Sequence, residues 1–168
     1  GGISMVEIIK ASEEYAESFY QALDIVARER KYLGIVKGFP LEGVKDFVSM
    51  NVANDYAQYY AIDGNKVIGW CDIIPKRNEG FTHVGILGIG LLSEYRNQGI
   101  GSKLIEKAME HAVKRNGIEK VELEVFESNI NAIRLYEKFG FVYEGKRIKS
   151  RKLDGVYDNV VMMGKEVL

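Results

Sequence analysis

One stretch of the sequence, residues 83–126, places the tightest constraint on the fold. It has an apolar run over 83–92, a short polar loop, a run with helical apolar spacing over 99–115, and an alternating run over 119–126. A strand, a helix and a second strand in this order predict two parallel strands joined by a helical crossover. Ligands of such sheets usually bind at this kind of unit, so the junction between the first strand and the helix is the first candidate site.

The remaining segments predict antiparallel strands and helices around this unit. Ser12, followed by two glutamates, predicts a helix start, and Asp63-Gly64 predicts a tight hairpin because glycine supplies the positive φ that such turns require. We expect an α/β fold with a partly antiparallel sheet. The expected elements are strand, two helices, three strands, helix, strand, helix and two strands, over 5–9, 12–27, 41–52, 55–62, 66–74, 83–92, 99–115, 119–126, 129–138, 141–148 and 157–165.

Length and composition exclude several classes of protein. The 168 residues suit one domain, placed at 5–168, and residues 1–4, which precede Met5, are expected to be a cloning remnant. The 23 Lys and Arg against 24 Asp and Glu argue against a protein that tracks nucleic acid, and no apolar run reaches about 18 residues, so no membrane span is expected. Cys71 is the only cysteine, which excludes an internal disulfide and fits a reducing cytoplasm.

The loop before the long helix has the composition of an anion-binding turn. Arg96-Asn-Gln-Gly-Ile-Gly101 leads into the helix, whose first N–H groups lie at the positive end of its dipole. Gly99 and Gly101 allow close backbone approach, and Arg96 adds positive charge. The dinucleotide pattern G-x-G-x-x-G is absent because position 104 is leucine, and no Gly-Lys-Ser or Gly-Lys-Thr phosphate loop is present. The alternative interpretation is a glycine-rich helix start without a ligand.

The strand before this loop carries glycines on one face. Gly88 and Gly90 share one face, whereas Leu87, Ile89 and Leu91 occupy the other. We expect the glycine face to be stripped of side chains. The pattern therefore predicts a groove in which backbone groups bind an extended ligand.

Two motifs together resemble one known family. Arg96-Asn-Gln-Gly-Ile-Gly101 matches the R/Q-x-x-G-x-G/A signature of the GCN5-related N-acetyltransferases (GNAT), and the run from Asn129 through Tyr136 to Phe141 matches their N-x-x-A-x-x-L-Y-x-x-x-G-F signature. The chain is most similar to bacterial and archaeal members that acetylate protein N-termini or small amines. The resemblance implies a mixed, mostly antiparallel sheet of about seven strands flanked by about four helices, with a splayed parallel strand pair that holds acetyl-CoA.

The resemblance also implies how acetyl-CoA, a co-substrate, is held. Backbone groups of Ile89, Gly90 and Leu91 would pair with its pantetheine arm like an added strand. Asn129 would bond the same arm with help from Asn131, although asparagine there also suits a helix N-cap. No metal site is expected, because nothing has metal-ligand spacing. The pyrophosphate would bind to the loop and first helical turn, at Arg96, Asn97, Gln98, Gly99, Ile100, Gly101 and Ser102.

Two residues take catalytic roles by this resemblance. Tyr136 matches the family's general acid, and a phenol with a pKa of about 10 can protonate a thiolate whose pKa is near 8.5. Glu124 matches a position that acts as a base in some members, directly or through water, and Glu122 on the same face is the fallback. The alternatives are a core tyrosine on an apolar helix face and a glutamate that only lines the groove.

The expected function is transfer of an acetyl group from acetyl-CoA to a primary amine by direct attack. The amine would be a protein N-terminus, an amino acid or a polyamine-like small molecule, contacted by Glu29, Tyr32, Tyr157 and Asp158. A covalent route is not expected because Cys71, the one thiol, lies away from both motifs. The alternatives are a non-catalytic acyl-CoA sensor or interaction module on the same fold and a transferase of longer acyl chains. A homodimer would fit exposed terminal strands.

Two further groups of residues receive no catalytic role. His83 and His111 are expected at the surface or at an interface. The run over 146–152 carries five positive charges in seven residues and predicts a solvated hairpin arm. Its alternatives are attraction of an acidic substrate or of the 3′-phosphate of CoA.

Overall fold

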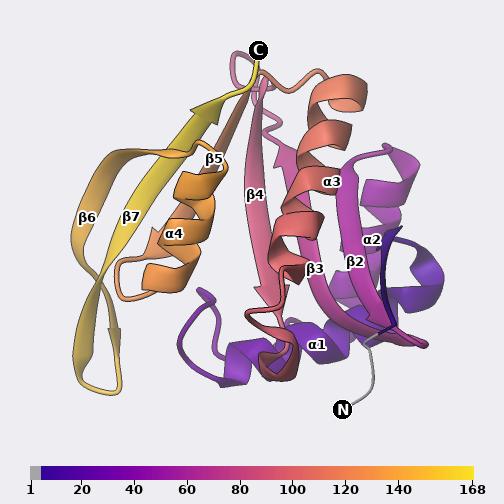
Figure 1. Ribbon diagram of the computed structural model, residues 1–168, viewed down its shortest axis with the longest axis horizontal. Helices are drawn as coiled ribbons and strands as arrows, with labels where there is room; N and C mark the ends of the chain where they lie inside the picture. Colours follow the sequence, from indigo (N-terminus) through magenta and orange to yellow (C-terminus); the bar gives the residue numbers. More distant parts are fainter. Residues whose placement is uncertain (1–4) are drawn as a thin grey trace.

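The structure is a computed structural model that describes residues 5–168, so the expected cloning remnant at 1–4 lies outside the described residues. The described strands form one sheet in the spatial order β1-β2-β3-β4-β5-β7-β6 (Figure 1). The strands are β1 (Val6–Lys10), β2 (Ala57–Asp63), β3 (Lys66–Pro75), β4 (Val84–Leu91), β5 (Lys120–Phe126), β6 (Val142–Leu153) and β7 (Val156–Glu166). The helices are α1 (Ala16–Arg28), α2 (Leu41–Ala53), α3 (Ile100–Asn116) and α4 (Ile130–Lys138), with short 3-10 turns η1 (Glu13–Tyr15) and η2 (Ser93–Tyr95).

One pair of neighbouring strands in the described sheet is parallel. β4 and β5 pair over 84–86 and 120–122, and every other neighbouring pair runs antiparallel. α3 joins the two parallel strands, as the order of strand, helix and strand predicts. The expected mixed α/β fold with a mostly antiparallel sheet is confirmed.

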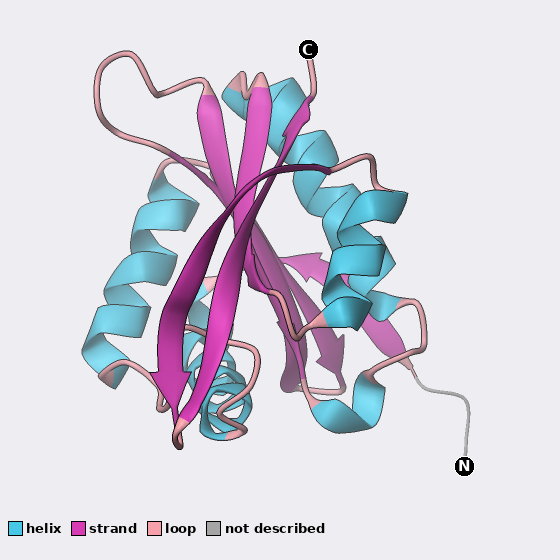
Figure 2. Cartoon of the chain, turned by 90° about the vertical axis from the view of Figure 1, so that its left-hand side faces the viewer, coloured by secondary structure: helices cyan, strands magenta, loops and turns pink. Residues whose placement is uncertain are grey.

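The helices cover both faces of the twisted sheet (Figure 2). On one face Phe19 of α1 packs against Tyr60 of β2 and Trp70 of β3, with ring centroids 5.2 and 5.6 Å apart. On the other face Tyr59 of β2 contacts His111 of α3 at 5.6 Å. Because side chains alternate along a strand, even-numbered residues in the middle of β2 to β5 face α1 and α2, and odd-numbered residues face α3.

Two local predictions need correction. The side chain of Ser12 makes no capping hydrogen bond, and the one-turn helix η1 stands before α1, which begins at Ala16. β6 continues to Leu153, so the whole basic run over 146–152 belongs to a long strand. The run still forms an exposed hairpin arm, because most of its side chains are exposed.

The expectation that His111 lies at the surface or an interface is wrong. Its side chain is buried, with 3% of its surface exposed. The Oη of Tyr59 lies 2.9 Å from its Nδ1, and the carbonyl oxygen of Asp55 lies 2.7 Å from its Nε2. Both polar ring atoms thus find partners in the core, which the helical pattern of the sequence does not show.

Candidate functional site

β4 and β5 separate after their third pair. Beyond Ile86 and Glu122 they form no further ladder in the described residues, although β4 continues to Leu91 and β5 to Phe126 (Figure 1). β4 remains paired with β3 along this stretch. The edge of β4 over 87–91 that faces β5 therefore carries backbone groups that an extended ligand can pair with.

α3 follows this open edge after the loop over 92–99, which includes η2, and it lacks a side-chain cap. Gly99 is its N-cap residue, with a φ of 81° and a ψ of 2°, and its cap position makes no side-chain hydrogen bond. Asn97 has a φ of 62°, so the loop enters the left-handed region twice. Apart from its two chain neighbours, no residue has an atom within 4 Å of the point where a Cβ of Gly99 would stand. The turn thus presents the first N–H groups of a helix, and the positive end of its dipole, to an approaching anion.

At this turn the side chains of Gln98 and Ile100 are engaged within the protein, and the backbone N–H groups are the part suited to a ligand. The Nε2 of Gln98 donates to the carbonyl oxygen of Glu94 at 3.0 Å, and Ile100 is buried. A Cβ on Gly101 would lie 3.4 Å from Cδ2 of Leu135, so a side chain of α4 packs beside this glycine. Ser102 is half-buried.

The glycine face of β4 is not an open groove. A Cβ on Gly90 would lie 2.3 Å from ring atoms of Trp70, and a Cβ on Gly88 would lie 3.3 Å from Oδ1 of Asp72. These side chains stand on β3 directly opposite the two glycines. The prediction of a face stripped of side chains is therefore wrong, because the neighbouring strand covers it with its own residues.

Arg96 and Glu29, which were expected to meet different ligands, bind each other. The guanidinium donates to both carboxylate oxygens of Glu29 at 2.6 and 2.8 Å, and to the carbonyl oxygen of Leu91 at 2.8 Å. It also stacks on the ring of Tyr32, 4.6 Å from the centroid. The hydrogen bonds that Arg96 donates to Glu29 raise the pKa of its guanidinium. Arg96 thus links the end of β4 to the segment that follows α1.

The second motif forms the start and core of α4. Asn129 is the N-cap, and its Oδ1 accepts a hydrogen bond from the backbone N–H of Ala132 at 3.3 Å, so the N-cap interpretation is confirmed. Asn131 is exposed. Tyr136 is buried, and its ring lies edge-on to Phe141 with centroids 6.0 Å apart. Burial raises the pKa of Tyr136, so its phenol keeps its proton at neutral pH.

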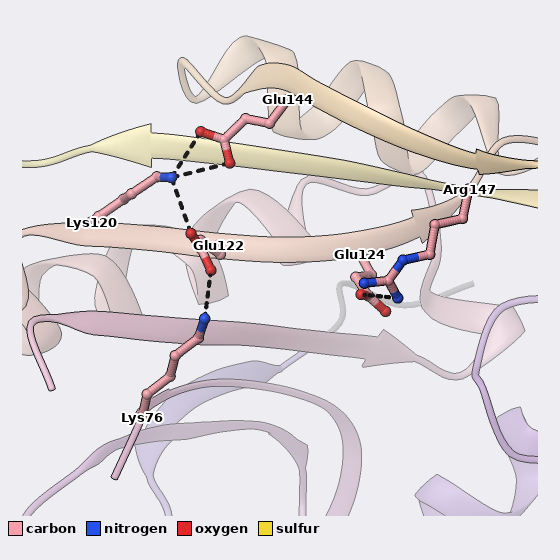
Figure 3. Close-up of polar contacts among 6 residues, drawn as sticks. All are labelled: Lys76, Lys120, Glu122, Glu124, Glu144 and Arg147. Atoms are coloured by element: carbon pink, nitrogen blue, oxygen red, sulfur yellow. Dashed lines mark hydrogen bonds and ion pairs between the residues drawn. The ribbon is translucent and has the colours of Figure 1, made fainter. Parts of the chain in front are cut away.

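The two glutamates considered as bases have different surroundings (Figure 3). Glu122 accepts hydrogen bonds from Lys76 at 2.9 Å and from Lys120 at 3.0 Å. The hydrogen bond from Lys76 lowers the pKa of the Glu122 carboxyl, which makes it a weak proton acceptor. Glu124 lies 3.3 Å from Arg147, and both side chains are more than half exposed, at 59% and 62%. A pair this exposed contributes little energy and can open.

The candidate acceptor residues on β7 belong to the hairpin with β6. Asp158 accepts a hydrogen bond from Arg151 at 3.2 Å and another from the hydroxyl of Ser128. Tyr157 is half exposed, and the ammonium group of Lys149 lies 4.8 Å from its ring centroid. Asp158 is therefore part of the hairpin framework, while Tyr157 remains accessible.

Residues near the tip of the β6–β7 hairpin contact the segment that follows α1. Arg30 donates to both carboxylate oxygens of Asp154 at 2.8 and 3.0 Å. Arg151 donates to the carbonyl oxygen of Lys31 at 3.1 Å. Arg151 also contacts Asp158, so these contacts and the pair of Arg96 and Glu29 join the segment after α1 both to the β6–β7 hairpin and to the end of β4.

The sequence alone did not mark Asp72, a polar residue on the face of the sheet that α1 and α2 cover, as a site residue. It lies in the middle of β3, between Gln58 of β2 and Gly88 of β4. Burial raises the pKa of its carboxyl to about 7. The signal in the sequence was an aspartate inside the otherwise apolar run over 67–74.

Three findings on residues 5–168 concern metal ligands, the thiol and membrane-spanning helices. Residues 5–168 contain no group of three or more His, Cys, Asp or Glu side chains placed to hold a metal ion. Cys71 is buried, and burial raises the pKa of its thiol well above the usual value. No helix within these residues is long and apolar enough to cross a membrane.

Comparison with known proteins gives consistent relatives. The sequence profile described as the Acetyltransferase (GNAT) family matches residues 13–141. The L-amino acid N-acetyltransferase AaaT of Escherichia coli is 32% identical over 104 residues, which cover 62% of this chain and 64% of AaaT. An N-alpha-acetyltransferase of Saccharolobus solfataricus is 34% identical over 106 residues, covering 57% of this chain and 60% of that protein. The chain thus matches just under two thirds of the length of these relatives.

Solved structures share the fold over nearly the whole chain. A GNAT-family acetyltransferase from Streptococcus pneumoniae has a TM-score of 0.88 at 27% identity, covering 96% of this chain and 99% of that one. The putative acetyltransferase yncA from Salmonella typhimurium, solved with its cofactor acetyl-CoA, has a TM-score of 0.88 at 15% identity, covering 97% and 94%. At that identity the second likeness concerns the fold alone.

Proposed function

The chain belongs to the Acetyltransferase (GNAT) family, and from this premise we propose that it transfers an acetyl group from acetyl-CoA to a primary amine by direct attack. One observation carries the proposal: β4 loses its partner strand over 87–91 and leads into the uncapped N-terminus of α3. A free strand edge suits the amide-containing arm of the cofactor, and a helix N-terminus suits its pyrophosphate.

The residues at this junction fit such a ligand. The open space beside Gly99 and its left-handed backbone expose the first turn of α3 to an anion, so the backbone from Asn97 to Ser102 would hold the pyrophosphate. Backbone groups of Ile89 to Leu91 would hold the arm. Arg96 would act here through its bonds to Glu29 and Leu91, by fixing the loop between β4 and α3. Asn129 and Asn131 would flank the arm from the start of α4.

Acetyl transfer would use two protein groups, a proton donor and a proton acceptor. When bound, acetyl-CoA supplies an activated acetyl thioester. The buried phenol of Tyr136 keeps its proton at neutral pH and would donate it to the departing sulfur. A carboxylate on the α1 and α2 face would accept the amine proton, and Glu124 is the candidate that family resemblance suggests. The buried Cys71 thiol, with its raised pKa, suits no covalent route.

Binding is tested by calorimetry with acetyl-CoA on the wild type, Gly99→Ala and Gly99→Asp. Both variants place a side chain at φ 81°, and only aspartate adds a negative charge at the helix N-terminus. We expect Gly99→Asp to bind about tenfold more weakly than Gly99→Ala, a difference of about 1.4 kcal/mol. Absence of binding by the wild type, or equal binding by both variants, would contradict the assignment of the α3 N-terminus as the pyrophosphate site.

Turnover is tested by following CoA thiol release with an amino acid, a peptide with a free N-terminus and a polyamine as acceptors. Acetylated product formed with any of these amines supports the transferase. Binding of acetyl-CoA without release of thiol in the presence of all three would favour the non-catalytic sensor instead.

A further inference from the structure

Asp72 stands on the face of the sheet that α1 and α2 cover, next to the place where β4 and β5 separate. It is directly opposite Gly88 on β4 and Gln58 on β2. Its Oδ1 lies 3.3 Å from the point that a Cβ of Gly88 would occupy. Because Gly88 has no side chain, the carboxylate extends over β4 just beyond the last β4–β5 pair, which ends at Ile86.

The carboxylate of Asp72 differs from the other acidic groups of this face in having no partner. None of the hydrogen bonds or ion pairs found among residues 5–168 involves it, whereas Glu122 binds two lysines and Glu124 contacts Arg147. Its side chain is half-buried, so it is both desolvated and reachable. An unpaired carboxylate held partly out of water is costly, and such groups are concentrated at functional sites.

The neighbours of Asp72 keep its environment poor in charge. From β2, the buried hydroxyl of Tyr60 has no hydrogen-bond partner in the described structure, and burial and then the nearby Asp72 carboxylate raise its pKa. From β3 itself, Cys71 is buried with a raised pKa and points to the opposite face. α1 contributes the apolar Phe19 near Tyr60, and Gly88 contributes no side chain. Within the described residues no cation faces Asp72, so burial alone raises the pKa of its carboxyl, to about 7.

The position of Asp72 relative to the proposed acetyl-CoA site determines which part of that ligand it would contact. A ligand whose pyrophosphate is held at the start of α3 and whose arm pairs with Leu91, Gly90 and Ile89 runs backward along β4. Its reactive end then comes to Gly88, the residue opposite Asp72. This step rests on the proposed function, because the direction of the pantetheine arm follows from the proposed pyrophosphate site at the start of α3.

We propose that Asp72 is a catalytic residue, the base that accepts the proton from the acceptor amine during acetyl transfer. The amine nitrogen forms a bond to the acetyl carbon while the carbon–sulfur bond breaks. The proton lost by nitrogen passes to a carboxylate oxygen of Asp72, and the sulfur takes the proton of Tyr136. The proton on Asp72 then returns through solvent to the Tyr136 oxygen, so both groups regain their starting states. A base whose pKa is near the working pH is well matched to this task.

The kinetic test compares the wild type with Asp72→Asn, Glu124→Gln and Asp46→Asn. Asp46 is exposed on α2, so its variant is a control for the same chemical change away from the site. We expect Asp72→Asn to lower kcat by about 10²-fold or more, with little change in the Kd of acetyl-CoA. The wild type and Asp46→Asn should show a rise of kcat with pH centred near 7, and Asp72→Asn should lack it. Loss of that rise in Glu124→Gln, with Asp72→Asn unaffected, would overturn the proposal.

A second measurement does not depend on activity. Carbon-13 NMR titration of the aspartate carboxyl groups in the free protein should show one group titrating near pH 7 in the wild type and in Asp46→Asn, and none in Asp72→Asn. If no aspartate carboxyl titrates above about pH 6, the assignment fails. A wild type that acetylates no amine would remove the proposed function and the base role together. An active enzyme whose Asp72→Asn variant keeps its rate and pH profile would remove only the role of Asp72.

Discussion

Arg96 and Glu29, 67 residues apart in the sequence, form a two-pronged ion pair at 2.6 and 2.8 Å. About a quarter of each side chain is exposed, 24% for Arg96 and 25% for Glu29. Arg96 also donates to the carbonyl oxygen of Leu91 and stacks on Tyr32. The pair therefore couples the loop that would hold a pyrophosphate to the segment that would border the acceptor.

Loss of this pair should destabilise the protein more than loss of an exposed pair. We expect Glu29→Ala to lower the free energy of unfolding by about 1–3 kcal/mol, because it leaves a partly buried guanidinium without its bidentate partner. Glu110→Ala breaks the exposed helical pair with Lys114 and should cost about 0.5 kcal/mol or less. Urea unfolding of both variants measures the difference. Equal effects would mean that the Arg96–Glu29 pair is no stronger than a surface contact.

Gly90→Ala should destabilise the protein because the new methyl group would overlap the ring of Trp70. Overpacking of this kind costs about 1–3 kcal/mol. Gly43→Ala is the matched control, since it lies inside α2 with no atom within 4 Å, and it should stabilise by about 0.5–1 kcal/mol. Thermal unfolding of both variants checks the opposite signs. If Gly90→Ala is neutral, Trp70 has room to move and is not the reason for this glycine.

Tyr136→Phe should lower turnover by about 10²-fold while leaving the Kd of acetyl-CoA unchanged. The ring packs against Phe141, so the phenylalanine variant keeps this contact and removes only the hydroxyl. Steady-state kinetics and calorimetry on the same preparations measure the two effects. Unchanged turnover would leave Tyr136 as a packing residue of α4.

Asp72 should make the stability of the protein depend on pH. The ordinary pKa of this carboxyl is 3.8 and the folded value is about 7, so between these values the unfolded chain has lost a proton that the folded chain keeps. The contribution of this carboxyl to the free energy of unfolding is therefore fully present below about pH 4 and is lost as the pH rises toward 7. The free energy of unfolding falls by at most about 1.4 kcal/mol per pH unit over this range. Asp72→Asn removes this loss, so its stability relative to the wild type should grow from pH 4.5 to pH 7. Urea unfolding across this range tests it, and a constant difference between the two proteins would contradict a raised pKa.

Much of the fold could be predicted because its signals are local. The helical spacing over 99–115 and the alternation over 119–126 each depend on a few neighbouring residues, and both predicted elements are present as α3 and β5. Gly99 was predicted at the helix start, where the backbone does require a left-handed residue. The prediction of the β6 end at 148 was wrong, because strand pairing with β7 extends it to Leu153 despite the charged sequence.

The candidate site was predicted only where it depends on backbone and local motif. The loop before α3 and the Asn129 cap are local, so their positions followed from the sequence. The partners of Arg96, Glu122 and Asp158 did not, because each ion pair joins segments that are distant along the chain or meet only by strand pairing. His111 was misplaced for the same reason, since its two partners come from other elements.

The sequence by itself determined that this chain forms a strand-helix-strand unit with a glycine turn at the start of its long helix, and that two motifs of one family follow one another in register. The tertiary structure alone decided which side chains share a face. Strand register set Trp70 over Gly90 and Asp72 over Gly88, so glycines whose shared face predicted a ligand groove serve the packing of β3. Periodicity along one strand cannot reveal the residue across from it, and pairing with that residue determines whether a gap in side chains is filled or open.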